Sequence, residues 1–162
     1  MKIKNYFISD KNGKSNCVVR SLCKVLDKPY EEVYNELLKI ANENNLSYND
    51  IYVFETYMEK NNIIKTKDTS NIKVSELDID EGTYIVFCYD KKDYYHMFPI
   101  INNVVYDKND LCLNLYVISI YECFYNWYEQ KVIDISKKKY YFIYIFFERG
   151  NEDAYRYYFK IL

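Results

Sequence analysis

Glycine, proline and histidine are scarce in this chain, which has three glycines, two prolines and one histidine among its 162 residues. So few glycines and prolines exclude collagen-like chains and disordered segments rich in these residues. An excess of one charge is also missing, because 22 basic and 24 acidic residues leave a net charge of −2. That balance provides no electrostatic footprint for duplex nucleic acid, so we expect no nucleic-acid partner.

Long apolar runs, signal-peptide features and close cysteine pairs are missing as well. No segment approaches the ~18–20 apolar residues of a membrane-spanning helix, so we expect no membrane association. Residues 1–10 contain two lysines but no apolar core of a signal peptide, and the five cysteines form no C-x-x-C pair. We therefore expect reduced thiols and a cytoplasmic location. Because zinc-ligand spacings are also missing, no metal and no cofactor is implied.

Apolar residues are abundant, and their spacing predicts three helices near the N-terminus. Hydrophobic residues make up 49% of the chain, enough for a sizeable core. We expect helices over residues 17–26, from Pro29 onward, and from a capping box at Ser47-x-x-Asp50 to about residue 61. Their predicted inward faces are Val18, Ser21, Leu22 and Val25, then Val33, Leu37, Ile40 and Ala41, then Ile51, Phe54 and Met58.

Segments rich in β-forming residues follow the helices. Asn102-Asn103 is a two-residue turn of the type that accepts positive φ. Helices followed by strands predict an α+β fold, with N-terminal helices packed on a C-terminal antiparallel β-sheet, in one domain over residues 1–162. Residues 121–162 are expected to form a C-terminal extension. The predicted strands are 83–89, 94–101, 104–107 and 113–120, with a terminal β-hairpin of 140–147 and 154–161.

Cys17 has a position that favours a reactive thiol. It follows a polar loop with a turn at Gly13, and Asn16 is suited to cap the helix that starts at Cys17. A helix N-terminus stabilises a thiolate, which is the nucleophilic form of cysteine. The alternative is a small cysteine that packs beneath the helix. Arg20 either favours the thiolate further or forms a structural ion pair.

His96 is the only histidine, so any Cys–His mechanism must use it. With a two-residue turn at 102–103, His96 faces Asn109 directly and Asp107 diagonally, on one face of the sheet. Either residue can orient the imidazole as the third member of a catalytic set. Alternatively, Asp107 only ends the strand and His96 only bonds locally. Pro99 lacks an N–H and suits a sheet edge or an irregularity in this hairpin.

Two parts of the sequence resemble small papain-like cysteine peptidase domains of bacteria and phages. Asn16-Cys17-Val18-Val19-Arg20-Ser21-Leu22 and Lys28-Pro29-Tyr30-Glu31-Glu32-Val33-Tyr34 are similar to the D/N-C-V-V-R-A and G-K-x-Y-x-E-V-Y helices of that family. Gly82-Thr83-Tyr84-Ile85-Val86, His96 and Val104-Val105-Tyr106-Asp107 are similar to its G-T-Y-V-V strand and its His–Asp pair. The resemblance covers about residues 12–120.

The resemblance implies a papain-like fold and a set of catalytic roles. Cys17 would be the nucleophile, His96 the general base and acid, and Asp107 the residue that orients His96, with Asn109 as the alternative. Papain-like enzymes often hold the oxyanion with a glutamine before the cysteine. The loop here has none, so Asn12 with the Cys17 backbone N–H is the candidate, and Asn16 is a weaker one.

The function implied by the resemblance is an intracellular thiol hydrolase. We expect a cysteine peptidase that cleaves peptide or isopeptide bonds in a peptide or protein substrate. Deamidation and acyl transfer share the same acyl-enzyme and stay open. A different class also stays open: a non-catalytic binding or inhibitory protein on a papain-like scaffold, which contacts a protein partner or a second copy through the Tyr-rich residues 140–161.

Overall fold

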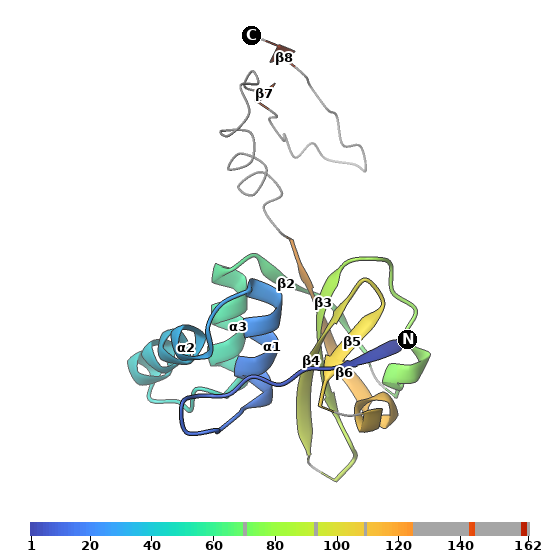
Figure 1. Ribbon diagram of the computed structural model, residues 1–162, viewed down its shortest axis with the longest axis horizontal. Coiled ribbons are helices and arrows are strands. Elements are labelled where there is room, and N and C mark those ends of the chain that lie inside the picture. The colour runs from blue at the N-terminus through green and yellow to red at the C-terminus, as the bar shows by residue number, and fades with distance from the viewer. Residues whose placement is uncertain (70, 93, 109, 125–142, 145–159, 162) are drawn as a thin grey trace. The chain divides into compact units, whose positions relative to one another are not determined.

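A computed structural model describes residues 1–69, 71–92, 94–108, 110–124, 143–144 and 160–161. The chain divides into two units, Met1–Tyr125 and Asn126–Leu162, which we describe separately. The first unit contains helices α1 (Cys17–Leu26), α2 (Tyr30–Asn44) and α3 (Ile51–Lys60) and a six-stranded sheet (Figure 1). The predicted α+β class is thus confirmed.

The sheet is mixed, which corrects the expectation of a purely antiparallel one. Its strands run in the order β1-β5-β4-β3-β6-β2, and each neighbouring pair is antiparallel except β1 and β5, which are parallel. The strands are β1 (Lys2–Asn5), β2 (Ile63–Asp68), β3 (Thr83–Tyr89), β4 (Tyr95–Ile101), β5 (Val104–Asp107) and β6 (Tyr116–Cys123).

The two strands without a sequence prediction, β1 and β2, form the two edges of the sheet. In β2 only Ile63 is buried, and in β1 only Ile3 is half-buried. Neither strand therefore shows the alternation of apolar and polar residues that identifies a half-buried strand. Backbone ladders hold both in place, and polar side chains suit edge strands because they discourage pairing with other chains.

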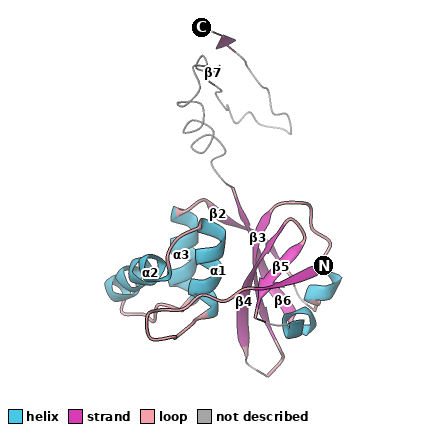
Figure 2. Ribbon diagram, in the orientation of Figure 1, coloured by secondary structure: helices cyan, strands magenta, loops and turns pink. Residues whose placement is uncertain are grey.

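The sheet separates two hydrophobic clusters, and the helices cover one of its faces (Figure 2). Ile85 and Phe87 of β3 pack with the helices, whereas the alternate residues Val86 and Cys88 join the cluster on the other face. This division follows from the period of two along a strand. Short 3₁₀ turns lie before β3 at Val74–Glu76 and before β6 at Asp110–Asn114.

Helices α1 and α2 agree with the sequence prediction. Helix α1 begins at Cys17 and ends at Leu26 as expected, and α2 begins at Tyr30, directly after Pro29. Every residue predicted for their inward faces is buried. Helix α3 also has Phe54 and Met58 buried as expected, but Ile51 is 50% exposed. Ile51 is the first residue of α3, and at this end of the helix the core does not cover its side chain.

The N-terminal cap of α3 differs from the predicted capping box. Asp50 is itself the cap, and its carboxylate accepts a hydrogen bond from the Tyr52 N–H at 2.9 Å. Ser47 instead donates its hydroxyl to the Asn49 side chain at 2.6 Å, outside the helix. The predicted capping box is therefore wrong: Asp50 and not Ser47 is the cap, and the third residue of the helix is Val53, which has no side-chain acceptor to complete a box.

This cap makes a stability prediction. Asp50→Ala is expected to lower the free energy of unfolding by about 1 kcal/mol, because it leaves the first turn of α3 without its side-chain acceptor. Ser47→Ala is the matched control and should change stability by less than about 0.5 kcal/mol, as an exposed surface substitution does. Urea denaturation of both variants measures the difference, and equal effects would show that Asp50 is not the cap.

The β4–β5 hairpin has the predicted two-residue turn. Asn102 and Asn103 have φ of 48° and 60°, and Ile101 pairs with Val104 and Ile100 with Val105. The ladder stops there, where Pro99 would be the next residue of β4. Pro99 has no N–H to continue it, and β4 is an inner strand, so the irregularity is the correct alternative and the edge position is not.

The remaining strand predictions have mixed outcomes. The predicted strand 113–120 begins later, as β6, because its first residues belong to the 3₁₀ turn, and it continues to Cys123. The expected C-terminal extension therefore does not begin at residue 121, because residues 121–123 belong to the sheet of the first unit. In the second unit, β7 (Ile143–Tyr144) and β8 (Lys160–Ile161) pair antiparallel, within the two predicted strands of the terminal hairpin. The rest of that hairpin lies outside the described residues, so a single domain over 1–162 and contacts through 140–161 stay predictions. Among the helices that the structure describes, none has the length and hydropathy of a membrane span.

Candidate active site

The structure brings Cys17, His96 and Asp107 to one cleft of about 560 Å³. They come from the first residue of α1, the second residue of β4 and the last residue of β5. Cys17 is a free, half-buried thiol, whereas His96 and Asp107 are buried. The cleft is lined by Ser15, Asn16, Cys17, Arg20, Asp90, Tyr94, Tyr95, His96, Asp107, Lys108, Leu111, Cys112 and Leu115.

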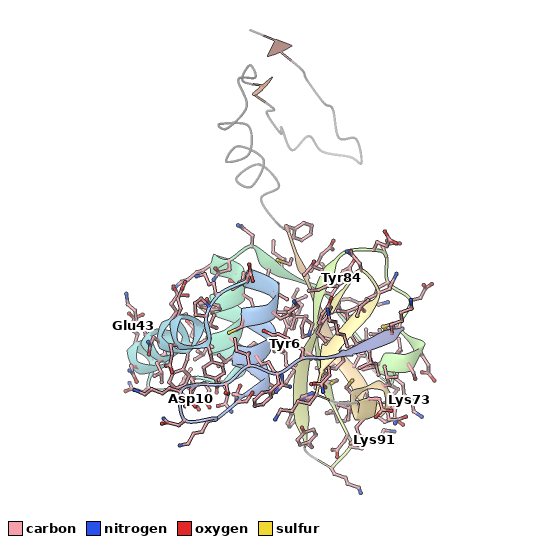
Figure 3. The ribbon with its side chains drawn as sticks, in the orientation of Figure 1. Tyr6, Asp10, Glu43, Lys73, Tyr84 and Lys91 are labelled. Carbon is pink, nitrogen blue, oxygen red and sulfur yellow. The ribbon has the colours of Figure 1, made fainter. Side chains whose placement is uncertain are left out.

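The loop before α1 fixes the position of Cys17. The Asp10 carboxylate, labelled in Figure 3, accepts hydrogen bonds from the backbone N–H groups of Asn12 and Lys14 at 2.9 and 2.7 Å. Gly13 completes this turn with a φ of 77°, a left-handed conformation that suits glycine. Asn16 then caps the helix, because its side-chain oxygen accepts from the Val18 N–H at 2.8 Å.

His96 and Asp107 form a short hydrogen bond beyond the end of the β4–β5 ladder. Nε2 of His96 lies 2.7 Å from Oδ2 of Asp107. That bond occupies Nε2, so Nδ1, which is buried and has no hydrogen-bond partner among the described residues, is the ring nitrogen available to Cys17. The interaction between the thiol and the imidazole lowers the pKa of Cys17, as described below. The thiol–imidazole contact is looser than a full hydrogen bond, which is common at active sites without substrate.

Arg20 ties the nucleophile helix to Asp107. Its Nη2 lies 2.8 Å from Oδ1 of Asp107, and both side chains are almost fully buried. Its Nη1 reaches the Ser15 hydroxyl at 3.4 Å, and that hydroxyl donates to the Ile8 carbonyl at 2.8 Å. Each oxygen of the Asp107 carboxylate thus has a cationic or imidazole partner. Asp107 is thereby held in place between α1 and β4.

These contacts shift the ionisation of the three residues in directions that favour an ion pair. Burial raises the pKa of the Cys17 thiol, but His96, the Met97 backbone N–H and Arg20 outweigh it, and the net pKa is lowered. Burial lowers the pKa of His96, but Asp107 and Cys17 outweigh it and raise the pKa to about 9. Burial likewise raises the pKa of Asp107, yet His96 and Arg20 bring it below its usual value. These directions favour a thiolate on Cys17 beside an imidazolium on His96.

Cys17 is distinct from the other cysteines. Burial raises the pKa of Cys23 and Cys112 to about 12 and that of Cys123 to about 11, and it also raises the pKa of Cys88. Each of these four thiols is buried. Only Cys17 combines a lowered pKa with access to a cleft, which is the environment of a reactive cysteine.

The structure does not bring Asn12 to the site. Asn12 is exposed in the loop, and the lining of the cleft includes Ser15 and Asn16 but not Asn12. Its backbone is committed to the Asp10 turn, which carries its side chain outward. Asn109, the alternative partner of His96, lies outside the described residues. Asp107 is the residue that the structure places against His96.

Two features of the site had no sequence prediction. The partner of Arg20 was left open, although a charge three residues after Cys17 lies on the same helical face and needs a counter-charge if buried. Tyr94 was not singled out, yet its ring stacks on His96 with centroids 5.9 Å apart. In the part of the chain that the structure describes, no group of His, Cys, Asp and Glu is arranged to hold a metal ion.

Comparisons with family models, with curated proteins and with solved structures give no match to this chain. The geometry of the cleft and the chemistry of its residues are therefore the basis for a function.

Proposed function

We propose that this chain is a cysteine hydrolase of papain-like type that cleaves amide bonds in peptides or proteins. The observation that carries the proposal is that Cys17, His96 and Asp107 line one cleft in which His96 is hydrogen-bonded to Asp107. Nε2 of His96 is 2.7 Å from Asp107, its Nδ1 has no competing partner, and the Cys17 thiol borders an open cleft. This is the arrangement of a nucleophile, a base and an orienting group.

Each residue has a defined step in the reaction. The Cys17 thiolate attacks the carbonyl carbon, so a C–S bond forms and the π electrons move to the carbonyl oxygen. The C–N bond then breaks as Nδ1 of His96 gives its proton to the leaving amine. Water next attacks the thioester and gives a proton to His96, and the Cys17 thiolate leaves. Asp107 keeps the imidazole oriented throughout.

The oxyanion has one clear donor. The N–H groups of the first helical turn have no partner within the helix, and the Asn16 side chain takes those of Val18 and Val19. The Cys17 N–H is left to donate to the carbonyl oxygen of a bound substrate, where the helix dipole also favours negative charge. The same acyl-enzyme serves deamidation or acyl transfer if the leaving group is ammonia or the acceptor is an amine.

The pH dependence of Cys17 alkylation tests the proposal. Iodoacetamide is expected to label Cys17 well below pH 9, because His96 lowers the pKa of its thiol. In His96→Ala the labelling of Cys17 at low pH should be lost, and labelling should begin only in the pH range of an ordinary thiol. Peptide mass spectrometry measures the labelling rate of each cysteine separately.

The other cysteines supply internal controls in the same experiment. Cys23 and Cys88 are buried and have raised pKa values, so they should label slowly at every pH in both proteins. Cys17 labelling that is no faster than theirs, and that does not change in His96→Ala, would contradict the proposed function.

A further inference from the structure

A second cleft meets the first one at Cys17. It has a volume of about 370 Å³ and lies between the start of α1, the start of α3 and the β3–β4 pair. Asn16, Cys17 and Tyr95 line both clefts, so the nucleophile lies on their common border. The full lining of the second cleft is Asn16, Cys17, Val18, Asn49, Asp50, Ile51, Phe54, Phe87 and Tyr95.

The location of His96 assigns a direction to a substrate that crosses this border. His96 lines the first cleft and is not among the residues that line the second. The amine that leaves must accept its proton from His96, so it lies on the side of the first cleft. The acyl part, which stays bound to the Cys17 sulfur, then extends into the second cleft.

Apolar and aromatic side chains make up most of the lining of the second cleft, beside the polar side chains of Asn16, Asn49 and Asp50. Phe54 and Phe87 are buried beneath it, with ring centroids 5.5 Å apart, and Tyr95 stacks on Phe87 with centroids 5.8 Å apart. Ile51 and Tyr95 are about half exposed at its surface, at 50% and 51%. Among the described residues, the first cleft contains more charged side chains, namely Arg20, Asp90, Asp107 and Lys108, whereas the second contains Asp50 alone.

Ile51 and Tyr95 thus expose apolar surface in a cleft that the nucleophile borders. A large apolar group that covers both would remove their surface from water, which is favourable in proportion to the area buried. Asp50 is the one acidic residue of the cleft, and its carboxylate is engaged by the Tyr52 N–H. In the described part of the chain no Lys, Arg or His lines the cleft, so an acidic substrate side chain would find no counter-charge there, and the only carboxylate already caps α3.

We propose that the cleft of Ile51, Phe54, Phe87 and Tyr95 is an acyl-side specificity pocket that selects a large apolar side chain of the substrate. This inference rests on the proposed function and adds the class of substrate. Selection arises because such a side chain is buried against Phe54 and Phe87 as the carbonyl carbon reaches Cys17. A small side chain does not fill the pocket, so water stays in it and the stabilisation from burial is lost.

Two chloromethyl ketones, of N-acetyl-phenylalanine and N-acetyl-glycine, provide the test. Each reagent alkylates a thiolate, with an S–C bond formed and chloride released. Each labelling rate at Cys17 is divided by the iodoacetamide rate of the same protein, which corrects for the reactivity of the thiolate. In the wild type we expect the phenylalanine reagent to be about 10- to 200-fold faster than the glycine reagent.

Ile51→Asp and Tyr52→Asp form a matched pair of variants. Both place an aspartate in the first turn of α3, but Tyr52, which is 54% exposed, does not line the cleft. We expect Ile51→Asp to lower the phenylalanine-to-glycine ratio about tenfold, because it brings a charge to an apolar pocket. Tyr52→Asp should keep the wild-type ratio.

The outcomes separate the pocket from the proposed function. Equal rates for the two reagents, with fast His96-dependent iodoacetamide labelling, would overturn the pocket and leave the hydrolase standing. An equal fall of the ratio in both variants would also overturn the pocket. Slow, His96-independent iodoacetamide labelling would overturn the hydrolase and the pocket with it.

Discussion

Cleavage of an anilide and of an ester by this chain is expected to diverge above about pH 9, where His96 loses its proton. The anilide rate should fall about tenfold per pH unit beyond that point, because amide cleavage requires one proton from His96. The rate for the ester should stay level, since its phenolate leaving group departs without a proton. N-acetyl-phenylalanyl p-nitroanilide and the matching p-nitrophenyl ester report both reactions by absorbance.

His96→Ala is expected to slow the anilide reaction strongly. Removal of a positioned acid and base costs typically about 10²–10⁴-fold in rate. The anilide reaction should lose that factor, and its decline above about pH 9 should disappear with the group that titrates there. On the acidic side, both reactions of the wild type should fall as the Cys17 thiolate gains a proton.

A Cys17→Ala variant controls for hydrolysis that does not depend on the site, because it keeps the fold and removes only the sulfur. Its anilide and ester rates should equal the background in buffer at every pH. If the anilide and ester profiles of the wild type were parallel above pH 9, His96 would not be the acid of the reaction, and the assignment of the leaving-group side would lose its basis.

Much of the site was predictable from local sequence. A helix start is encoded within a few residues, so Asn16 as a cap and Cys17 as the first helical residue followed from the pattern around them. The Asn102-Asn103 turn fixed the register of one hairpin, and register decides which side chains share a face. That turn predicted His96 and Asp107 on one face of the sheet within reach of each other, and the two are hydrogen-bonded although the β4–β5 ladder ends before them.

The features that were not predictable depend on contacts between distant elements. Arg20 and Asp107 are separated by 87 residues, and the charge pattern around either one does not identify the other. Strands β1 and β2 are held by backbone hydrogen bonds to their neighbours, and the pattern of side chains along the sequence does not reveal such bonds. The second cleft exists only where α3 approaches Phe87 and Tyr95. The prediction of Asn12 as an oxyanion donor was wrong for a related reason. Its position is set by the turn at Asp10 and not by its short distance in sequence from Cys17.

The Arg20–Asp107 pair carries the largest stability prediction. Asp107→Asn is expected to lower the free energy of unfolding by about 3–5 kcal/mol, because it leaves the Arg20 charge without a counter-charge in the interior. Arg20 is only 4% exposed, and besides Asp107 its side chain contacts the neutral Ser15 hydroxyl, at 3.4 Å. Asparagine has nearly the same volume as aspartate, so packing is retained and the change isolates the charge.

Arg20→Met should cost less than Asp107→Asn at neutral pH, and this asymmetry distinguishes the network from a simple pair. When Arg20 is removed, Asp107 keeps the protonated His96 at 2.7 Å, whereas removal of Asp107 leaves Arg20 without its carboxylate partner. The double variant should cost less than the sum of the two, since neither charge is then left alone. Urea denaturation of the four proteins at pH 7 gives the cycle.

The stability that Arg20→Met loses relative to the wild type is expected to depend on pH. The raised pKa of His96 contributes stability that is fully present below pH 6.5 and is lost as the pH rises through about 9. In the wild type, Arg20 still neutralises Asp107 after that loss. In Arg20→Met no cation remains beside Asp107, so the stability gap between the two proteins should widen from pH 7 to pH 10. A difference in stability that does not change with pH would mean that His96 does not share the Asp107 charge. The proposed link between Arg20 and Cys17 through Asp107 and His96 would then be wrong.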